Sequence, residues 1–228
     1  MAISRPNPRV SINQLAGYLV GTPTQRRRIL RDAKNPPTFM VNWYDPARQC
    51  INEFVAGGMA NEAILTNEIN RLSAAVPSSD YEETRFRTNA EALESVLGSY
   101  DQLDFAGLTP ALAPNDQPYL GVCGVEISVR PEFFLSGTYR SRATVGGLKL
   151  YFSKENCLTD TSAPYITCVV MRHVQANCTS GGAVARQGSC LVYDVFAGRV
   201  YAAPSAVTRR FQDIDAACQE ITLVWPTV

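Results

Sequence analysis

Glu132 and Lys149 are the residues whose types and spacing best suit chemistry. The segments Val125–Arg130 and Leu148–Ser153 both alternate apolar and polar residues, which is typical of strands with one buried face. Glu132 follows Pro131 at the end of the first predicted strand, and Lys149 lies inside the second. If these strands pair, the carboxylate and the ammonium group project from one face of a sheet. A carboxylate can hold a divalent cation beside a lysine that positions water, which is the chemistry of phosphodiester hydrolysis. The alternative is a structural ion pair on the exposed face of a hairpin.

This arrangement resembles the PD-(D/E)XK nuclease superfamily, particularly its RecB-like branch, over roughly residues 90–203. The resemblance implies a restriction-endonuclease-like mixed sheet flanked by helices. It also implies that a catalytic form would bind a divalent metal, Mg²⁺ or Mn²⁺. Glu132 matches the acid of the first strand, and Lys149 matches the lysine of the next. Gly147 stands two residues before the lysine, where the family has Glu, Asp or Gln, so the middle metal ligand is missing.

Other acidic residues could complete a metal site. In the family an additional acid often comes from a helix before the sheet, and Glu94 or Glu91 is the candidate here. A migrated acid such as Glu126 or Glu155 could replace the missing ligand; otherwise the site is catalytically inactive. The sequence leaves both alternatives open.

Asp194 and His173 are further titratable residues within apolar segments. Asp194 interrupts a strand predicted over 190–196, where a buried carboxylate needs a partner. A structural pair is favoured over a role as a metal ligand, and the candidate partners are Arg199, Arg140 and Lys149. His173 lies among apolar neighbours of a helix predicted over 163–176. A core position is therefore favoured over a role as a general base.

Two short helices are predicted at the start of the chain. Ser11 and Thr22 each open a capping box, which Gln14 and Gln25 complete three residues later. Residues 11–34 thus have a helix-turn-helix outline. The second helix carries the strongest basic cluster in the sequence, namely Arg26, Arg27, Arg28, Arg31 and Lys34. These side chains could bind nucleic-acid phosphates, although a solvated face whose arginines pair with acids of the following helices is favoured.

The predicted fold class is α/β (α+β). Residues 1–104 form a helical region that includes a short apolar run at 38–44. Helices are predicted at 46–56 with Asp45 as the cap, at 60–76, and at 80–103 with Tyr81 facing inward. Residues 118–228 form a mixed sheet with flanking helices, which includes a hairpin at 190–203 and a last helix capped by Ser205. The proline-rich segment 108–119 either links two domains or leads from the helices into the sheet that they cover. We favour the second, which allows one continuous domain.

The composition restricts the partners. Lys+Arg and Asp+Glu balance at 21 each, so any nucleic-acid surface must be local. Seven cysteines without a CxxC pair favour a reducing cytoplasm, and Cys123, Cys168 and Cys218 fall at apolar-periodic positions. We expect no membrane segment, because no apolar run is long enough to cross a bilayer.

Three functions follow from these features. The first is a metal-dependent nuclease, and the second is a degenerate, non-catalytic accessory subunit that binds nucleic acid or a protein partner in bacterial defence or DNA processing. The third is a helix-turn-helix regulator with a C-terminal sensor sheet. P-loop, GxGxxG, GxSxG and HExxH motifs are absent from the sequence.

Overall fold

The computed structural model describes residues 4–37 and 42–228, so the predicted apolar run at 38–44 lies mostly outside this part. Its α-helices are α1 (Ile12–Val20), α2 (Pro23–Lys34), α3 (Asp45–Ala56), α4 (Ala63–Ala74), α5 (Asp80–Leu97), α6 (Ala163–Asn177) and α7 (Thr208–Val224). Its strands are β1 (Arg9–Ser11), β2 (Thr109–Leu112), β3 (Leu120–Val122), β4 (Val125–Ser128), β5 (Phe133–Tyr139), β6 (Arg142–Tyr151), β7 (Val184–Asp194) and β8 (Arg199–Ala202). The protein is therefore mixed α/β, as predicted. No helix of the described part is long and apolar enough to cross a membrane.

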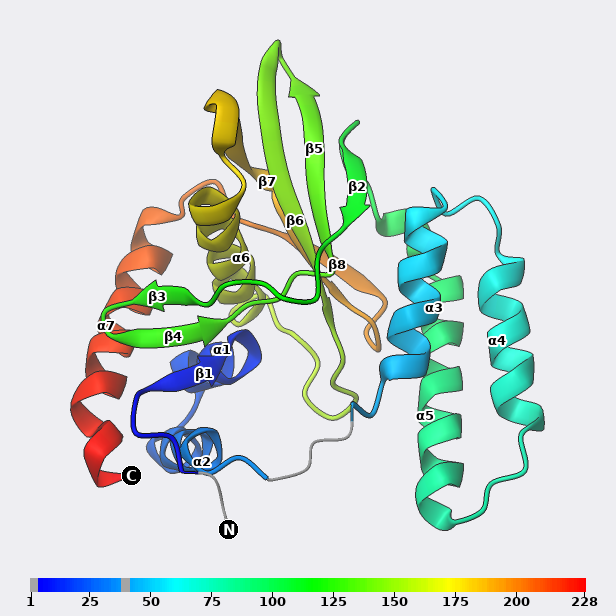
Figure 1. Cartoon of the computed structure of the whole chain (residues 1–228), viewed down its shortest axis with the longest axis horizontal. Coiled ribbons are helices and arrows are strands. Elements are labelled where there is room, and N and C mark those ends of the chain that lie inside the picture. Colours follow the sequence, from blue (N-terminus) through cyan, green and yellow to red (C-terminus); the bar gives the residue numbers. More distant parts are fainter. Residues whose placement is uncertain (1–3, 38–41) are drawn as a thin grey trace.

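The main sheet has the strand order β2-β5-β6-β7-β8. Strand β5 is antiparallel to both β2 and β6, and β8 is antiparallel to β7. Strands β6 and β7 are parallel, which requires a crossover connection, and α6 provides it. Strand β6, which carries Lys149, is thus the central strand (Figure 1).

Helices cover both faces of this sheet (Figure 1). Because side chains alternate along a strand, Leu148 and Leu150 pack on one face with residues of α3, α4 and α5 such as Phe54 and Leu93. The opposite face packs against α6, with α1 and α7 in the same hydrophobic cluster. The helices between residues 45 and 97 therefore share a core with the sheet instead of forming a separate one.

A small second sheet has the order β1-β4-β3. Strand β4 pairs in parallel with β1, so that Arg9 is in register with Glu126. The predicted pairing of the 125–130 strand with the Lys149 strand is therefore wrong. The chain leaves β4 and turns at Arg130 and Pro131, where Arg130 has a φ of 47°. The segment 133–139, which lies between the two predicted strands, is the strand β5 that pairs with the strand of Lys149.

The predicted helix starts are correct where a side chain caps the helix. Both capping boxes form, at Ser11 and at Thr22. Asp45 was predicted as a cap but is the first residue of α3, and its carboxylate accepts a hydrogen bond from Arg48. Ser205 was also predicted as a cap, whereas α7 begins at Thr208 without a side-chain cap.

Other local predictions need correction. Tyr81 was expected to point inward but is 47% exposed, because α5 extends beyond the core at its first turn. Cys123 was expected in an apolar position but is exposed, since it occupies the turn between β3 and β4 with a φ of 46°. Cys168 and Cys218 are buried as predicted. The strand predicted at 190–196 begins earlier, because β7 starts at Val184.

Candidate functional site

Glu132 and Lys149 lie opposite each other, as the sequence predicted. The strand pair that brings them together is β5 and β6, however, and Glu132 directly precedes β5. Phe133 is in register with Leu148, so the preceding residue, Glu132, faces Lys149 across the strand pair. Lys149 Nζ lies 3.0 and 3.2 Å from the two carboxylate oxygens of Glu132 and 2.8 Å from the carbonyl oxygen of Arg130. The three N–H donors of the ammonium group thus meet three acceptor atoms.

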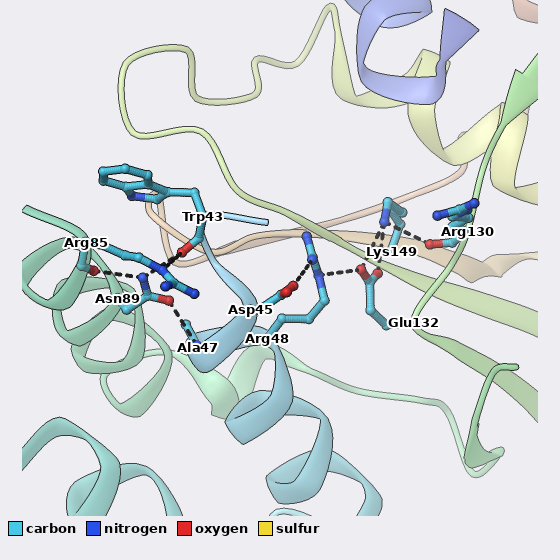
Figure 2. Close-up of polar contacts among 9 residues, drawn as sticks. All are labelled: Trp43, Asp45, Ala47, Arg48, Arg85, Asn89, Arg130, Glu132 and Lys149. Atoms are coloured by element: carbon cyan, nitrogen blue, oxygen red, sulfur yellow. Dashed lines mark hydrogen bonds and ion pairs between the residues drawn. The ribbon is translucent and has the colours of Figure 1, made fainter. Parts of the chain in front are cut away.

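One further donor and one further cation approach the Glu132 carboxylate. The backbone N–H of Leu150 donates to Oε2 at 2.6 Å, and Arg48 Nε on α3 forms an ion pair with Oε1 at 3.3 Å without a hydrogen bond. The side chain of Glu132 is 7% exposed, so the hydrogen bonds from Lys149 and from the Leu150 N–H replace the water that the carboxylate loses on burial. We call Arg48, Glu132 and Lys149 the Glu132 cluster; Figure 2 shows it reaching from Asp45 to Arg130.

Asn89 on α5 holds the start of α3, and with it Arg48, in place. Its side chain is fully buried. Asn89 Oδ1 accepts from the N–H of Ala47 at 3.0 Å, and Nδ2 donates to the carbonyl oxygens of Trp43 and Arg85 at 2.9 and 2.8 Å (Figure 2). A free N–H in the first turn of α3 is thus satisfied by another helix, which is why α3 needs no cap from Asp45.

Gly147 has a steric reason to be glycine. A Cβ at this position would lie 3.2 Å from methyl groups of both Val170 and Val174 on α6. Gly147 therefore permits the close approach of α6 to the sheet. The larger acidic side chain that the nuclease family has at this position would have to enter this packed layer. The layer has no room for such a side chain.

The other candidate acids do not join the Glu132 cluster. Glu94 is exposed and lines a hollow between α4 and α5 with Phe86 and Arg87, and no contact within the described chain links it to Glu132 or Lys149. Glu91 pairs with Lys154 at 2.6 Å. The migrated candidates also lie elsewhere: Glu126 pairs with Arg9 at 2.7 Å, and Glu155 lines a cleft beside Arg28.

Asp194 is fully buried, and its partners are backbone amides. The N–H of Leu158 donates to Oδ2 at 2.5 Å, and the N–H of Ala197 donates to Oδ1 at 3.2 Å. The predicted structural role therefore holds, but the predicted basic partners are wrong. Arg199 is in register with Asp194 but pairs with Asp160 at 2.9 Å, because its side chain points to the exposed loop.

A metal ion does not fit these residues. The described ranges contain no group of three His, Cys, Asp or Glu residues that could hold one. A cation at Glu132 would have a single carboxylate and would lie beside two positive side chains, Arg48 and Lys149. Metal-assisted hydrolysis needs the opposite balance of charge.

The basic cluster of α2 divides into two groups. Arg26 donates to the carbonyl oxygen of Gly21 at 3.1 Å and pairs with Glu220 at 3.5 Å, and Lys34 donates to the carbonyl oxygen of Trp225 at 2.8 Å. These two side chains hold α2 against α1 and α7. Arg27, Arg28 and Arg31 are exposed and form no ion pair within the described residues.

His173 occupies the core, as predicted. It is fully buried, and its ring stacks on Phe134 with centroids 6.2 Å apart. Nε2 lies 3.2 Å from Gln117 Oε1. Burial lowers the pKa of His173, so the neutral form is favoured in the folded protein.

Arg48 and Asn89 are the site residues that sequence reasoning missed. Arg48 carries no local signal, because only the packing of α3 on the sheet brings it to Glu132. Asn89 does carry one: it shares a helical face with the apolar residues Leu93 and Val96, and a polar residue on such a face indicates a buried hydrogen-bonding role.

Comparison with known proteins identifies no relative of this chain. No protein-family model matches the chain, and no curated protein sequence matches it. The function of the Glu132 cluster is therefore judged from its geometry.

Proposed function

We propose that this chain is a non-catalytic nucleic-acid-associated protein, an accessory form of a nuclease-like scaffold. The observation that carries this proposal is the saturation of Glu132. Its carboxylate is buried and engaged by Lys149, Arg48 and the N–H of Leu150. A carboxylate in this state stabilises the fold and has little remaining capacity for a metal ion.

The finer fold that we propose is restriction-endonuclease-like. Two observations support it: an acid and a lysine face each other on neighbouring strands, and helices flank the mixed sheet on both faces. The lost acid at Gly147 then accounts for the change from a catalytic to an accessory role. In place of a metal ligand, this position provides close packing for α6.

The exposed arginines of α2 support association with nucleic acid. Arg27, Arg28 and Arg31 lie on one short helix, and the protein has no net charge that would attract polyanions generally. Guanidinium groups bind phosphate oxygens through paired N–H donors. A local group of them therefore provides a phosphate-binding surface on a neutral protein.

The test measures binding and cleavage together. Fluorescently labelled single- and double-stranded DNA and RNA are titrated with the protein at several salt concentrations, and the same substrates are incubated with Mg²⁺, Mn²⁺ or EDTA. We expect salt-dependent binding and no cleavage. The triple variant Arg27→Ala/Arg28→Ala/Arg31→Ala should bind more weakly, with a salt slope lower by roughly one for each lost phosphate contact.

Arg87→Ala is the matched control, because Arg87 is an exposed arginine of α5 that lies among Glu83, Glu91 and Glu94. It should leave binding unchanged. Metal-dependent cleavage by the folded wild-type protein, abolished in Glu132→Gln, would overturn the non-catalytic assignment. The absence of binding to all four nucleic acids would overturn the association with nucleic acid.

A further inference from the structure

The end of the β5–β6 hairpin carries a group of arginines that lies at the opposite end of the molecule from α2 (Figure 1). Arg140 lies in the turn, Arg142 is the first residue of β6, and Arg186 comes from the neighbouring strand β7. We call these three residues and Tyr139 the hairpin-tip cluster. The hairpin extends beyond the helices that cover the sheet, so this cluster stands at a free end of the fold (Figure 1).

Tyr139 organises the arginines of this cluster. The guanidinium carbon of Arg186 lies 3.6 Å from the centre of the Tyr139 ring, and that of Arg140 lies 5.4 Å from it. Arg142 is in register with Tyr139 on the adjacent strand and is exposed. Contact with the aromatic ring orders the guanidinium groups of Arg186 and Arg140 without neutralising their charge.

The sequence around these arginines is free of acids. Residues 133–154 and 161–193 contain no Asp or Glu, and they include the whole hairpin and nearly all of β7. None of the three arginines forms an ion pair with another residue in the ranges that the structure describes. In a protein with equal numbers of acids and bases, three unbalanced charges at one end form a local positive surface.

The turn itself is an unusual place for an arginine. Arg140 and Ser141 both have positive φ, 47° and 64°, as the central residues of a type I′ hairpin turn do. Asn and Gly suit these positions best, whereas an arginine there is strained. The backbone does not call for this side chain, so the strain points to a use for its charge.

We infer that the hairpin-tip cluster binds the phosphate backbone of nucleic acid, independently of base sequence. The identity of the ligand rests on the proposed function, and the surface is a new one. Three guanidinium groups provide paired donors for phosphate oxygens. The contact that we infer is to phosphate oxygens, which guanidinium groups bind through paired N–H donors, and contacts of this kind carry no base-sequence information.

The experiment compares four proteins by fluorescence anisotropy with labelled single- and double-stranded DNA of two unrelated sequences. They are the wild type, Arg140→Ala/Arg142→Ala/Arg186→Ala, the same triple change to Lys, and Arg87→Ala. We expect the alanine triple variant to lose roughly tenfold in affinity and roughly three units of salt slope, equally for both sequences. The lysine variant should keep most of the slope, and Arg87→Ala should bind as the wild type does.

The outcomes separate this inference from the proposed function. If the alanine variant binds like the wild type while the α2 triple variant loses binding, the hairpin-tip inference is overturned and the proposed function stands. If the wild type binds no nucleic acid, both are overturned. The single variant Arg142→Ala guards against a folding artefact, since Arg142 is exposed; it should lower the slope by roughly one with an unchanged melting temperature.

Discussion

At the start of strand β5, one buried carboxylate accepts from Lys149 and pairs with Arg48. At the far end of the same strand pair, Arg140, Arg142 and Arg186 have no acid near them in sequence. Both ends gather positive side chains. One end pairs them with a buried carboxylate, whereas the other leaves Arg140 and Arg142 exposed and Arg186 half-buried. Cations that are already paired belong to the fold, whereas unpaired cations at a free edge are available to a partner.

Removing a cation from the paired end should have the largest effect. Lys149→Met leaves the Glu132 carboxylate buried without one of its two positive partners, which should lower the free energy of unfolding by about 3–5 kcal/mol. Urea unfolding followed by circular dichroism measures this loss. The control is Lys154→Met, which removes the exposed pair with Glu91 and should cost about 0–1 kcal/mol. Equal losses in the two variants would show that the Glu132 cluster is no more than a surface ion pair.

Adding a methyl group beside the Glu132 cluster should cost less. In Gly147→Ala the new Cβ meets Val170 and Val174 at 3.2 Å, so we expect a loss of about 1–3 kcal/mol from overpacking. Gly121→Ala is the matched control, since nothing lies within 4 Å of a Cβ there. An unchanged free energy of unfolding in Gly147→Ala would mean that space for the missing acid remains beside the Glu132 cluster. The paired end would then be less tightly packed than we describe.

The buried side chain of His173, which has no charged partner among the described residues, should make the stability of the protein depend on pH. Burial lowers the pKa of His173, while an unfolded histidine titrates near 6.5. As pH falls through about 6.5, the unfolded state takes up a proton before the folded state does, so the free energy of unfolding decreases. It becomes constant again below the folded-state pKa. Urea unfolding at a series of pH values should show this decrease in the wild type and a smaller one in His173→Gln; identical profiles would contradict it.

The smallest effect is expected at the aromatic ring of the exposed end. Tyr139→Leu keeps all three arginines but removes the ring beneath Arg186. We expect nucleic-acid affinity to fall by roughly two- to fivefold, in line with an exposed cation–π contact of about 0.5–1 kcal/mol. The salt slope should not change, because no charge is lost. A reduced salt slope would contradict this role, because it would mean that phosphate contacts are lost together with the Tyr139 ring.

Local signals predicted much of the fold. The capping boxes at Ser11 and Thr22 fix two helix starts, because their partners lie three residues away. Alternation assigned Lys149 to a strand and to the correct face. The mixed α/β class followed from such patterns, since each of them is set by neighbours in sequence.

Features that depend on distant residues were not predictable in this way. The predicted partner of the strand at 125–128 was wrong, because alternation indicates a strand but not its partner. The strand that pairs with it is β1, which lies more than a hundred residues away in the sequence. Asp194 was assigned basic partners because backbone amides from a loop cannot be read from sequence. The hairpin-tip cluster did leave a signal, the long stretch without acids, which a scan of charge by segment would detect.

The parallel pairing of β1 with β4 affects how the chain is made. A ribosome releases α1 and α2 before the residues that pair with β1, so β1 has no partner until residues 125–128 have emerged. The buried residues of α1 share their cluster with α6 and α7, which are synthesised later still. The exposed arginines of α2 therefore reach their native setting only after α7 has been synthesised.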